Sequence, residues 1–241
     1  MFKPPTLLLC GPAGIGKSAS IVKALNPDTT FWICTERGAL LPAKNKEINP
    51  SGKLPDYVEI LDYTSACEQV AAVIKNVLDG KGKRAYNAIV IDTLSALADM
   101  EYTRIRKVEG FRKEFGDANK ELGMRVNSIL WKLLDSNLLV VCTAHEKEPM
   151  NINGKITPGG PKLPGDLSKS VFSMFDLVLR CDLGADAKGN AKRVIRHSPL
   201  AIKTFQTKDR FGVVKDGDDL DVKDVLTKAM QIATQGETND G

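Results

Sequence analysis

The stretch GPAGIGKS, residues 11–18, decides how the rest of this sequence is interpreted. It matches G-x-x-x-x-G-K-[ST] at every fixed position, follows the apolar run TLLLC, and opens the helical pattern KSASIVKAL. Glycines allow backbone N–H groups to converge on phosphates, the lysine reaches the terminal phosphates, and the serine hydroxyl binds Mg²⁺. The stretch therefore predicts a phosphate-binding loop between a strand and a helix, with ATP and Mg²⁺ as cofactors.

A second part of the same site is expected at the end of another strand. Asp92 ends the apolar run AIVID and so reaches the same edge of a parallel sheet as a metal ligand. It can also cap the helix that follows, and the two roles are compatible. Ser18 is the other expected metal ligand, and Lys17 is expected to stabilise charge on the transferred phosphate. The residues predicted to bind the nucleotide and its metal are Gly11, Pro12, Ala13, Gly14, Ile15, Gly16, Lys17, Ser18, Ala19 and Asp92.

Short apolar runs alternate with helical patterns, which favours an α/β fold with a mainly parallel central sheet and helices on both faces. The runs predict strands at residues 6–10, 30–35, 57–61, 88–91, 138–143 and 175–181. One helix is expected to begin with a capping box of Ser65 and Glu68. Another spans residues 117–135, where Trp131 is expected to pack inside. Residues 184–212 predict an antiparallel β appendage, and residues 216–241 predict a helix with acids at its start and a polar tail.

Size and composition limit the remaining possibilities. The 241 residues, 42% of them hydrophobic, suffice for one sizeable core. A net charge of +4 is too small to indicate nucleic-acid binding by bulk charge, so any such site must be a local patch. No run is apolar enough for a signal or a membrane span, and the five cysteines lack metal-binding spacing. We expect a cytoplasmic protein without membrane association and with buried thiols.

The residue that activates water is not where many ATPases have it. Thr93 follows Asp92 in the place of a catalytic glutamate, and a threonine cannot act as the base. Open α/β sheets bind ligands at the carboxyl ends of neighbouring strands, and Glu36 directly follows the run TTFWICT. Glu36 is therefore the candidate base, and the alternative is an ordinary surface acid after a strand.

Four motifs in a fixed order suggest a family. The phosphate-binding loop, FWICTERG, VIDTLS and VVCTAHE together resemble the RecA-like ATPases. The resemblance implies that the catalytic glutamate is Glu36 and that His145 takes the place of a polar sensor of the γ-phosphate, often glutamine in that family. FQTKDRFG resembles a stretch whose basic pair reaches the ATP of the adjacent subunit, which makes Lys208 and Arg210 candidate trans fingers. The alternatives are a structural histidine and a solvated basic strand.

The ordered set is also similar to small phage-encoded RecA-like ATPases of the single-strand-annealing recombination group, over roughly residues 5–215. This resemblance implies a RecA-like core at residues 1–215 and a homo-oligomeric ring or filament with shared ATP sites. It also implies single-stranded DNA as partner, a single-strand binding protein as a further candidate partner, and location in the host cytoplasm.

RecA-like proteins hold DNA on two loops, for which residues 101–115 and 147–169 are the candidates. The first mixes basic and aromatic side chains, and the second is rich in glycine and proline and too long for a simple connection. The alternatives are a charged helix face and a surface lid. The predicted DNA contacts are Arg104, Arg106, Lys107, Phe111, Arg112, Lys147, Lys155, Lys162 and Lys169.

The favoured function is an ATP-dependent protein that binds or anneals single-stranded DNA and hydrolyses ATP at subunit interfaces, with DNA stimulating hydrolysis. A helicase or helicase-loader motor is one alternative, weakened because we expect no additional domain before the phosphate-binding loop. A non-hydrolysing ATP-gated DNA-binding module is another, suggested by Thr93. A small-molecule phosphotransferase also remains open.

Overall fold

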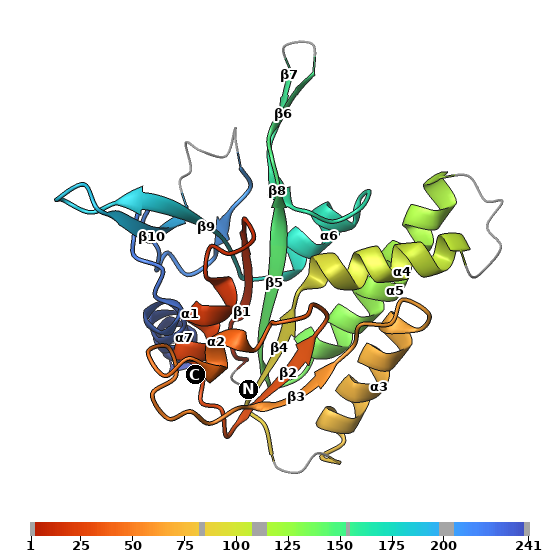
Figure 1. The fold of residues 1–241 in the computed structure, drawn as a ribbon, viewed down its shortest axis with the longest axis horizontal. Coiled ribbons are helices and arrows are strands. Elements are labelled where there is room, and N and C mark those ends of the chain that lie inside the picture. Colours follow the sequence, from red (N-terminus) through yellow and green to blue (C-terminus); the bar gives the residue numbers. More distant parts are fainter. Residues whose placement is uncertain (1–2, 82–84, 108–114, 153–154, 198–204, 239–241) are drawn as a thin grey trace.

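The computed structural model describes residues 3–81, 85–107, 115–152, 155–197 and 205–238. A twisted sheet runs through the molecule with the strand order β10-β9-β1-β5-β4-β2-β3, to which β8 adds beside β5 and β11 beside β9 (Figure 1). The strands are β1 (Thr6–Gly11), β2 (Thr30–Cys34), β3 (Asp56–Glu59), β4 (Ala88–Asp92), β5 (Leu139–Lys147), β6 (Met150–Ile152), β7 (Lys155–Thr157), β8 (Gly160–Pro161), β9 (Leu177–Ala185), β10 (Ala191–Arg196) and β11 (Lys208–Asp209). The helices are α1 (Lys17–Ala24), α2 (Leu41–Lys44), α3 (Ala66–Leu78), α4 (Leu94–Lys107), α5 (Phe115–Leu134), α6 (Leu167–Met174) and α7 (Val222–Thr238).

The centre of the sheet is parallel, as the alternation of apolar runs and helical patterns predicted. β1 pairs in parallel with β5 and β9, and β4 pairs in parallel with β5 and β2. Every residue of β1 and β4 is buried, because helices cover both faces of a parallel sheet. The expected α/β fold is therefore confirmed.

Helices form a layer on each face of the sheet (Figure 1). On one face α3, α4, α5 and α6 pack apolar side chains such as Val70, Leu122 and Val171 against the strands. On the other face α1 and α7 lie together and contribute Ile21 and Leu226 to a second cluster. The two clusters hold the strands rigidly, so that the loops at the carboxyl ends of the strands have fixed positions.

The antiparallel appendage is confirmed. β9 and β10 form a hairpin whose turn is closed by Asp186, which accepts hydrogen bonds from the backbone N–H of Lys188 and Asn190, and β11 pairs antiparallel with the start of β9. The turn expected near Ser198 lies outside the described residues. The acids before α7 act as expected at a helix start, since Asp221 accepts a hydrogen bond from the Asp224 N–H at 3.0 Å.

Three local expectations were wrong. Ser65 precedes α3 but makes no capping hydrogen bond through its side chain, and its hydroxyl instead accepts a hydrogen bond from Gln69 Nε2 at 2.8 Å. Trp131 is 54% exposed, because the buried stripe of α5 runs along Leu130 and its neighbours and leaves Trp131 on the outer side. Residues 147–169 are not a plain loop, since they contain the β6–β7 hairpin and the short strand β8.

Within the part of the chain that the structure describes, no helix is both long and apolar enough to cross a membrane.

Candidate nucleotide-binding site

The phosphate-binding loop lies between β1 and α1, as its sequence predicted. β1 ends at Gly11, and Gly16 stands at the N-cap of α1 with φ 101°, a left-handed conformation that favours glycine. A Cβ at Gly11 would lie 2.6 Å from the carbonyl oxygen of Cys181 on β9, so the strands approach there too closely for a side chain. The first turn of α1 presents its free N–H groups to the loop, which is the arrangement that binds phosphate.

The Lys17 side chain is held inside this loop. Its ammonium donates hydrogen bonds to the carbonyl oxygens of Gly11 and Pro12, each at 2.8 Å, and the residue is only 6% exposed. Burial lowers the pKa of Lys17, while the negative charge of the nearby Asp92 opposes that shift. The loop thus concentrates one positive charge where phosphate oxygens would meet it.

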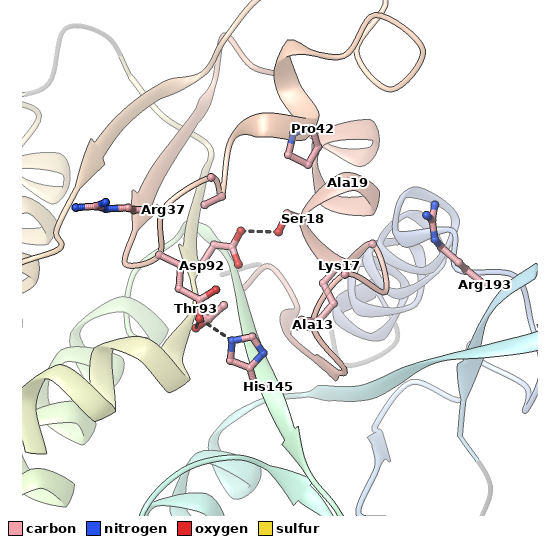
Figure 2. Close-up of a pocket in the computed structure, with 15 residues that line it drawn as sticks. Ala13, Lys17, Ser18, Ala19, Arg37, Pro42, Asp92, Thr93, His145 and Arg193 are labelled. Carbon is pink, nitrogen blue, oxygen red and sulfur yellow. Dashed lines mark hydrogen bonds and ion pairs between the residues drawn. The ribbon is translucent and has the colours of Figure 1, made fainter.

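Asp92 is bound by hydroxyl groups from two other elements. Its Oδ2 accepts a hydrogen bond from Ser18 Oγ at 2.7 Å (Figure 2), and its Oδ1 accepts one from Thr143 Oγ1 on β5. β5 lies between β1 and β4, which is why Thr143 reaches Asp92. Asp92 is 2% exposed, and burial raises its pKa against the opposing effect of the two hydrogen bonds.

This set of groups fits a Mg²⁺ ion that is bound with nucleotide. Mg²⁺ takes oxygen ligands and is usually held by one or two carboxylates together with substrate phosphates, which matches the hydroxyl of Ser18 and the carboxylate of Asp92. A cation would also relieve the cost of ionising the buried Asp92. The hydroxyl of Thr143, which the sequence analysis did not include, orients that carboxylate.

Glu36 and His145 were predicted separately, and the structure brings them together. Glu36 Oε1 lies 2.6 Å from His145 Nε2, and it also accepts a hydrogen bond from Thr93 Oγ1 at 2.9 Å. Thr93 is fixed in turn by Thr35, whose hydroxyl accepts a hydrogen bond from the Thr93 N–H and donates one to the Thr93 carbonyl oxygen. Thr93 cannot act as the base, but its hydroxyl positions Glu36, which is the candidate base.

One pocket of about 300 Å³, a size that suits a small ligand, is lined by Lys17, Ser18, Glu36, Asp92, Thr93 and His145. The loop lies along one side, Asp92 and His145 face it from β4 and β5 (Figure 2), and Glu36 joins them from the residues that follow β2. Two further cations line the pocket, Arg37 and Arg193. Sequence reasoning missed both: Arg37 is adjacent to Glu36, but Arg193 reaches the pocket only because β10 folds back beside β9. Thr143 had a signal, since it shares a strand face with His145 two residues later.

Lys208 and Arg210 lie at the end of the sheet where the parallel strands begin, opposite the end that holds the nucleotide pocket. β11 pairs with the first residues of β9, whereas the phosphate-binding loop follows the last residue of β1. Lys208 Nζ donates hydrogen bonds to the carbonyl oxygens of Phe175 and Ser173, and Arg210 Nη1 lies 2.6 Å from Asp176 Oδ1. The pair is therefore far from the nucleotide pocket of its own chain, and a role in a neighbouring subunit stays a prediction.

The first candidate DNA segment is only partly described. Arg104 is 6% exposed and its guanidinium donates hydrogen bonds to the fully buried Glu101, so the predicted DNA contact through Arg104 was wrong. Arg106 and Lys107 are exposed at the end of α4, with the Arg106 guanidinium 5.7 Å from the centre of the Tyr102 ring. The predicted contacts Phe111 and Arg112 lie outside the described residues.

The second candidate segment lies at the carboxyl ends of the parallel strands, which is the end of the sheet that also holds the nucleotide pocket. β5 continues beyond His145 to Lys147 and leads into the β6–β7 hairpin, which projects from the molecule (Figure 1). Lys147, Lys162 and Lys169 are exposed, and Lys155 begins β7. Lys169 Nζ donates a hydrogen bond to Asp166 Oδ1 at 2.9 Å.

Comparison with models of protein families gives a match over most of the chain. A family model described as an AAA domain matches residues 3–211, which contain all of the pocket residues named above and end just after β11. No curated protein matches the chain.

Proposed function

The chain belongs to the AAA domain family of P-loop ATPases, and on that premise we propose that it binds and anneals single-stranded DNA in recombination, using ATP hydrolysed at subunit interfaces. Family membership supports the nucleotide chemistry. The DNA partner and the shared site come from the ordered motifs, from the position of the β6–β7 hairpin and from the distance between Arg210 and its own phosphate-binding loop.

The pocket residues have distinct tasks in this proposal. The N–H groups of the loop and the ammonium of Lys17 bind the phosphates and stabilise the charge that develops during transfer. Ser18 and Asp92 would hold Mg²⁺, which when bound neutralises phosphate charge. Glu36 orients the attacking water and takes its proton. Because His145 and Thr93 both hold Glu36 Oε1, they set the direction of its carboxylate.

The observation that carries the DNA part is a set of hydrogen bonds that links His145 of the pocket, through Ser95, to the chain after the hairpin. The His145 N–H donates a hydrogen bond to Ser95 Oγ, and the His145 carbonyl oxygen accepts one from the Lys162 N–H at 2.7 Å. Ser95 Oγ in turn donates to the Lys162 carbonyl oxygen. A change at the phosphate side of His145 therefore shifts both chain segments that flank the hairpin, so that ATP state and DNA binding are coupled.

The test is the steady-state rate of ATP hydrolysis with and without single-stranded DNA. We expect DNA to stimulate the wild type, and Glu36→Gln to lose about 10²- to 10⁴-fold in kcat because the general base is removed. Glu59→Gln is the matched control, since Glu59 is an exposed acid that ends the adjacent strand β3. It should hydrolyse ATP at the wild-type rate.

Other outcomes favour the other functions. Hydrolysis that does not respond to DNA would point to a loader or a phosphotransferase, and ATP binding without hydrolysis would point to an ATP-gated DNA-binding module. Annealing of complementary oligonucleotides, measured with and without ATP, then distinguishes annealing from DNA binding alone.

A further inference from the structure

Arg193 contacts the phosphate-binding loop from the antiparallel hairpin. A Cβ built on Gly16 would lie 3.0 Å from Arg193 Nε, 3.1 Å from Cδ and 3.2 Å from Cζ. The guanidinium therefore lies against the backbone at the N-cap of α1, where only a glycine leaves room for it. Figure 2 shows Arg193 coming from β10, on the opposite side of the loop from Arg37.

The strand register explains this position. Side chains alternate between the faces of a strand, so Arg193 shares a face with Ile195, which is fully buried in the same apolar cluster as Ile15 and Ile21. Arg193 pairs with Leu183 of β9 in the hairpin. The packing of Ile195 thus directs Arg193 toward α1.

The cations beside Arg193 on β10 are paired with acids, and Arg193 is not. Lys192 Nζ lies 2.7 Å from Asp219 Oδ1, and Arg196 lies 3.8 Å from Asp182 and 3.7 Å from Asp216. Among the residues that the structure describes, Arg193 makes no ion pair. An exposed guanidinium without a counter-charge, next to a loop that binds phosphate, is suited to an anion because its planar N–H donors match phosphate oxygens.

We propose that Arg193 is a nucleotide-binding residue acting in cis, whose guanidinium donates hydrogen bonds to the phosphates of the nucleotide from the side of the loop opposite Glu36. This inference rests on the nucleotide site of the proposed function but not on its DNA partner. The contribution is to binding, because the proton transfer belongs to Glu36 on the other side of the pocket. Loss of Arg193 therefore raises KM and the dissociation constant, and changes kcat little.

The experiment measures equilibrium binding of ADP and of a non-hydrolysable ATP analogue, with Mg²⁺ and without DNA, by titration calorimetry. We expect Arg193→Ala to weaken both ligands roughly tenfold or more, since hydrogen bonds to charged groups are the stronger ones. Arg193→Lys should retain most of the affinity because it keeps the charge. Arg196→Ala, which removes a paired arginine from the same strand, should bind both ligands like the wild type.

Unchanged affinity in Arg193→Ala would overturn the inference, and so would an equal loss in Arg193→Ala and Arg196→Ala, which would indicate a general effect of the hairpin. Absence of nucleotide binding in the wild type would overturn it together with the nucleotide site. If Arg193→Ala weakens ADP binding while DNA fails to stimulate hydrolysis, the inference stands and the DNA function falls. Melting temperatures without ligand show whether each variant is folded.

Discussion

Asp92 depends on a hydroxyl group that approaches it from the neighbouring strand. Thr143 is fully buried on β5, and its Oγ1 donates to Asp92 Oδ1 while Ser18 holds Oδ2. A partner that orients a metal-binding carboxylate typically contributes 10- to 100-fold to metal affinity. Thr143→Val keeps the shape of the side chain and removes the hydroxyl. We expect the Mg²⁺ concentration for half-maximal ATP hydrolysis to rise about 10- to 100-fold.

The matched control for this variant is Thr6→Val. It removes a buried threonine hydroxyl at the start of β1, far from the pocket, where the hydroxyl donates a hydrogen bond to Asp176 Oδ2. Its Mg²⁺ requirement should not change. An unaltered Mg²⁺ requirement in Thr143→Val would mean that Asp92 is oriented by Ser18 alone.

The charge of Asp92 also has a cost in stability. A buried acid with a raised pKa binds its proton more tightly in the folded chain than in the unfolded one, so its ionised form destabilises the fold. This cost is present at neutral pH and disappears below the ordinary pKa of 3.8, where both states are protonated. Asp92→Asn removes the charge, so in the absence of nucleotide and Mg²⁺ we expect its melting temperature to exceed that of the wild type.

Thermal melts from pH 8 to pH 4 check this expectation. The advantage of Asp92→Asn should shrink as the pH falls, while its Mg²⁺-dependent ATP hydrolysis is lost at every pH. A melting temperature below that of the wild type at neutral pH would show that the hydrogen bonds from Thr143 and Ser18 outweigh the cost of burying the charge.

At the scale of elements, β5 joins the nucleotide pocket to the projecting hairpin. The same strand supplies Thr143 as a partner of Asp92, His145 to the pocket and then the exposed Lys147. If the hairpin segment contacts DNA, its lysines neutralise backbone phosphates, and each lost contact lowers the salt dependence of binding. For the double variant Lys147→Ala/Lys162→Ala we expect the slope of log affinity against log salt to decrease by about 1.4.

Binding of fluorescent single strands over a range of salt concentrations gives this slope. Lys75→Ala/Lys132→Ala is the control, because both lysines are exposed on helices, α3 and α5, that end near the opposite edge of the sheet. An equal decrease in both double variants would assign the effect to net charge, and no decrease in either would remove the segment from the DNA site. The double variant should retain its basal ATP hydrolysis.

At the scale of the whole molecule, the two halves of the proposed catalytic site lie at opposite edges of one subunit. Glu36 lines the nucleotide pocket, whereas Arg210 lies beside Asp176 and is 59% exposed. A site that needs both groups is complete only between two copies in a head-to-tail contact. We expect Arg210→Ala to bind ATP but not to hydrolyse it, and an equal mixture with Glu36→Ala to recover activity at roughly one interface in four.

The mixture is measured as hydrolysis against mixing ratio at constant total protein, after time for subunits to exchange. Recovery should be greatest near equal amounts. A mixture that stays inactive at every ratio, with exchange demonstrated by labelled subunits, would exclude a shared site.

The features that the sequence determined by itself are those encoded over short stretches of chain. Gly16, Lys17 and Ser18 form a loop whose backbone follows from local conformational preference, and the alternation of apolar runs and helical patterns determines a parallel sheet with helices on both faces. The position of Asp92 and Glu36 at strand ends followed from the same patterns, because parallel strands all end at one edge. Their roles in hydrolysis stay predictions.

Only the tertiary structure decided which of these groups touch. The contacts of Thr143 with Asp92 and of Glu36 with His145 depend on the order of strands in the sheet, which no local pattern encodes. The same holds for Arg193, which lies 177 positions after Gly16 in the chain (193 − 16) and meets it because the β9–β10 hairpin folds back to the N-cap of α1. Tertiary packing also reversed two expectations, since it buried Arg104 together with Glu101, its partner one turn earlier on α4, and left Trp131 exposed. The physical reason is that a side chain's partners are set by which surfaces pack together, and periodicity specifies only which face of an element is apolar.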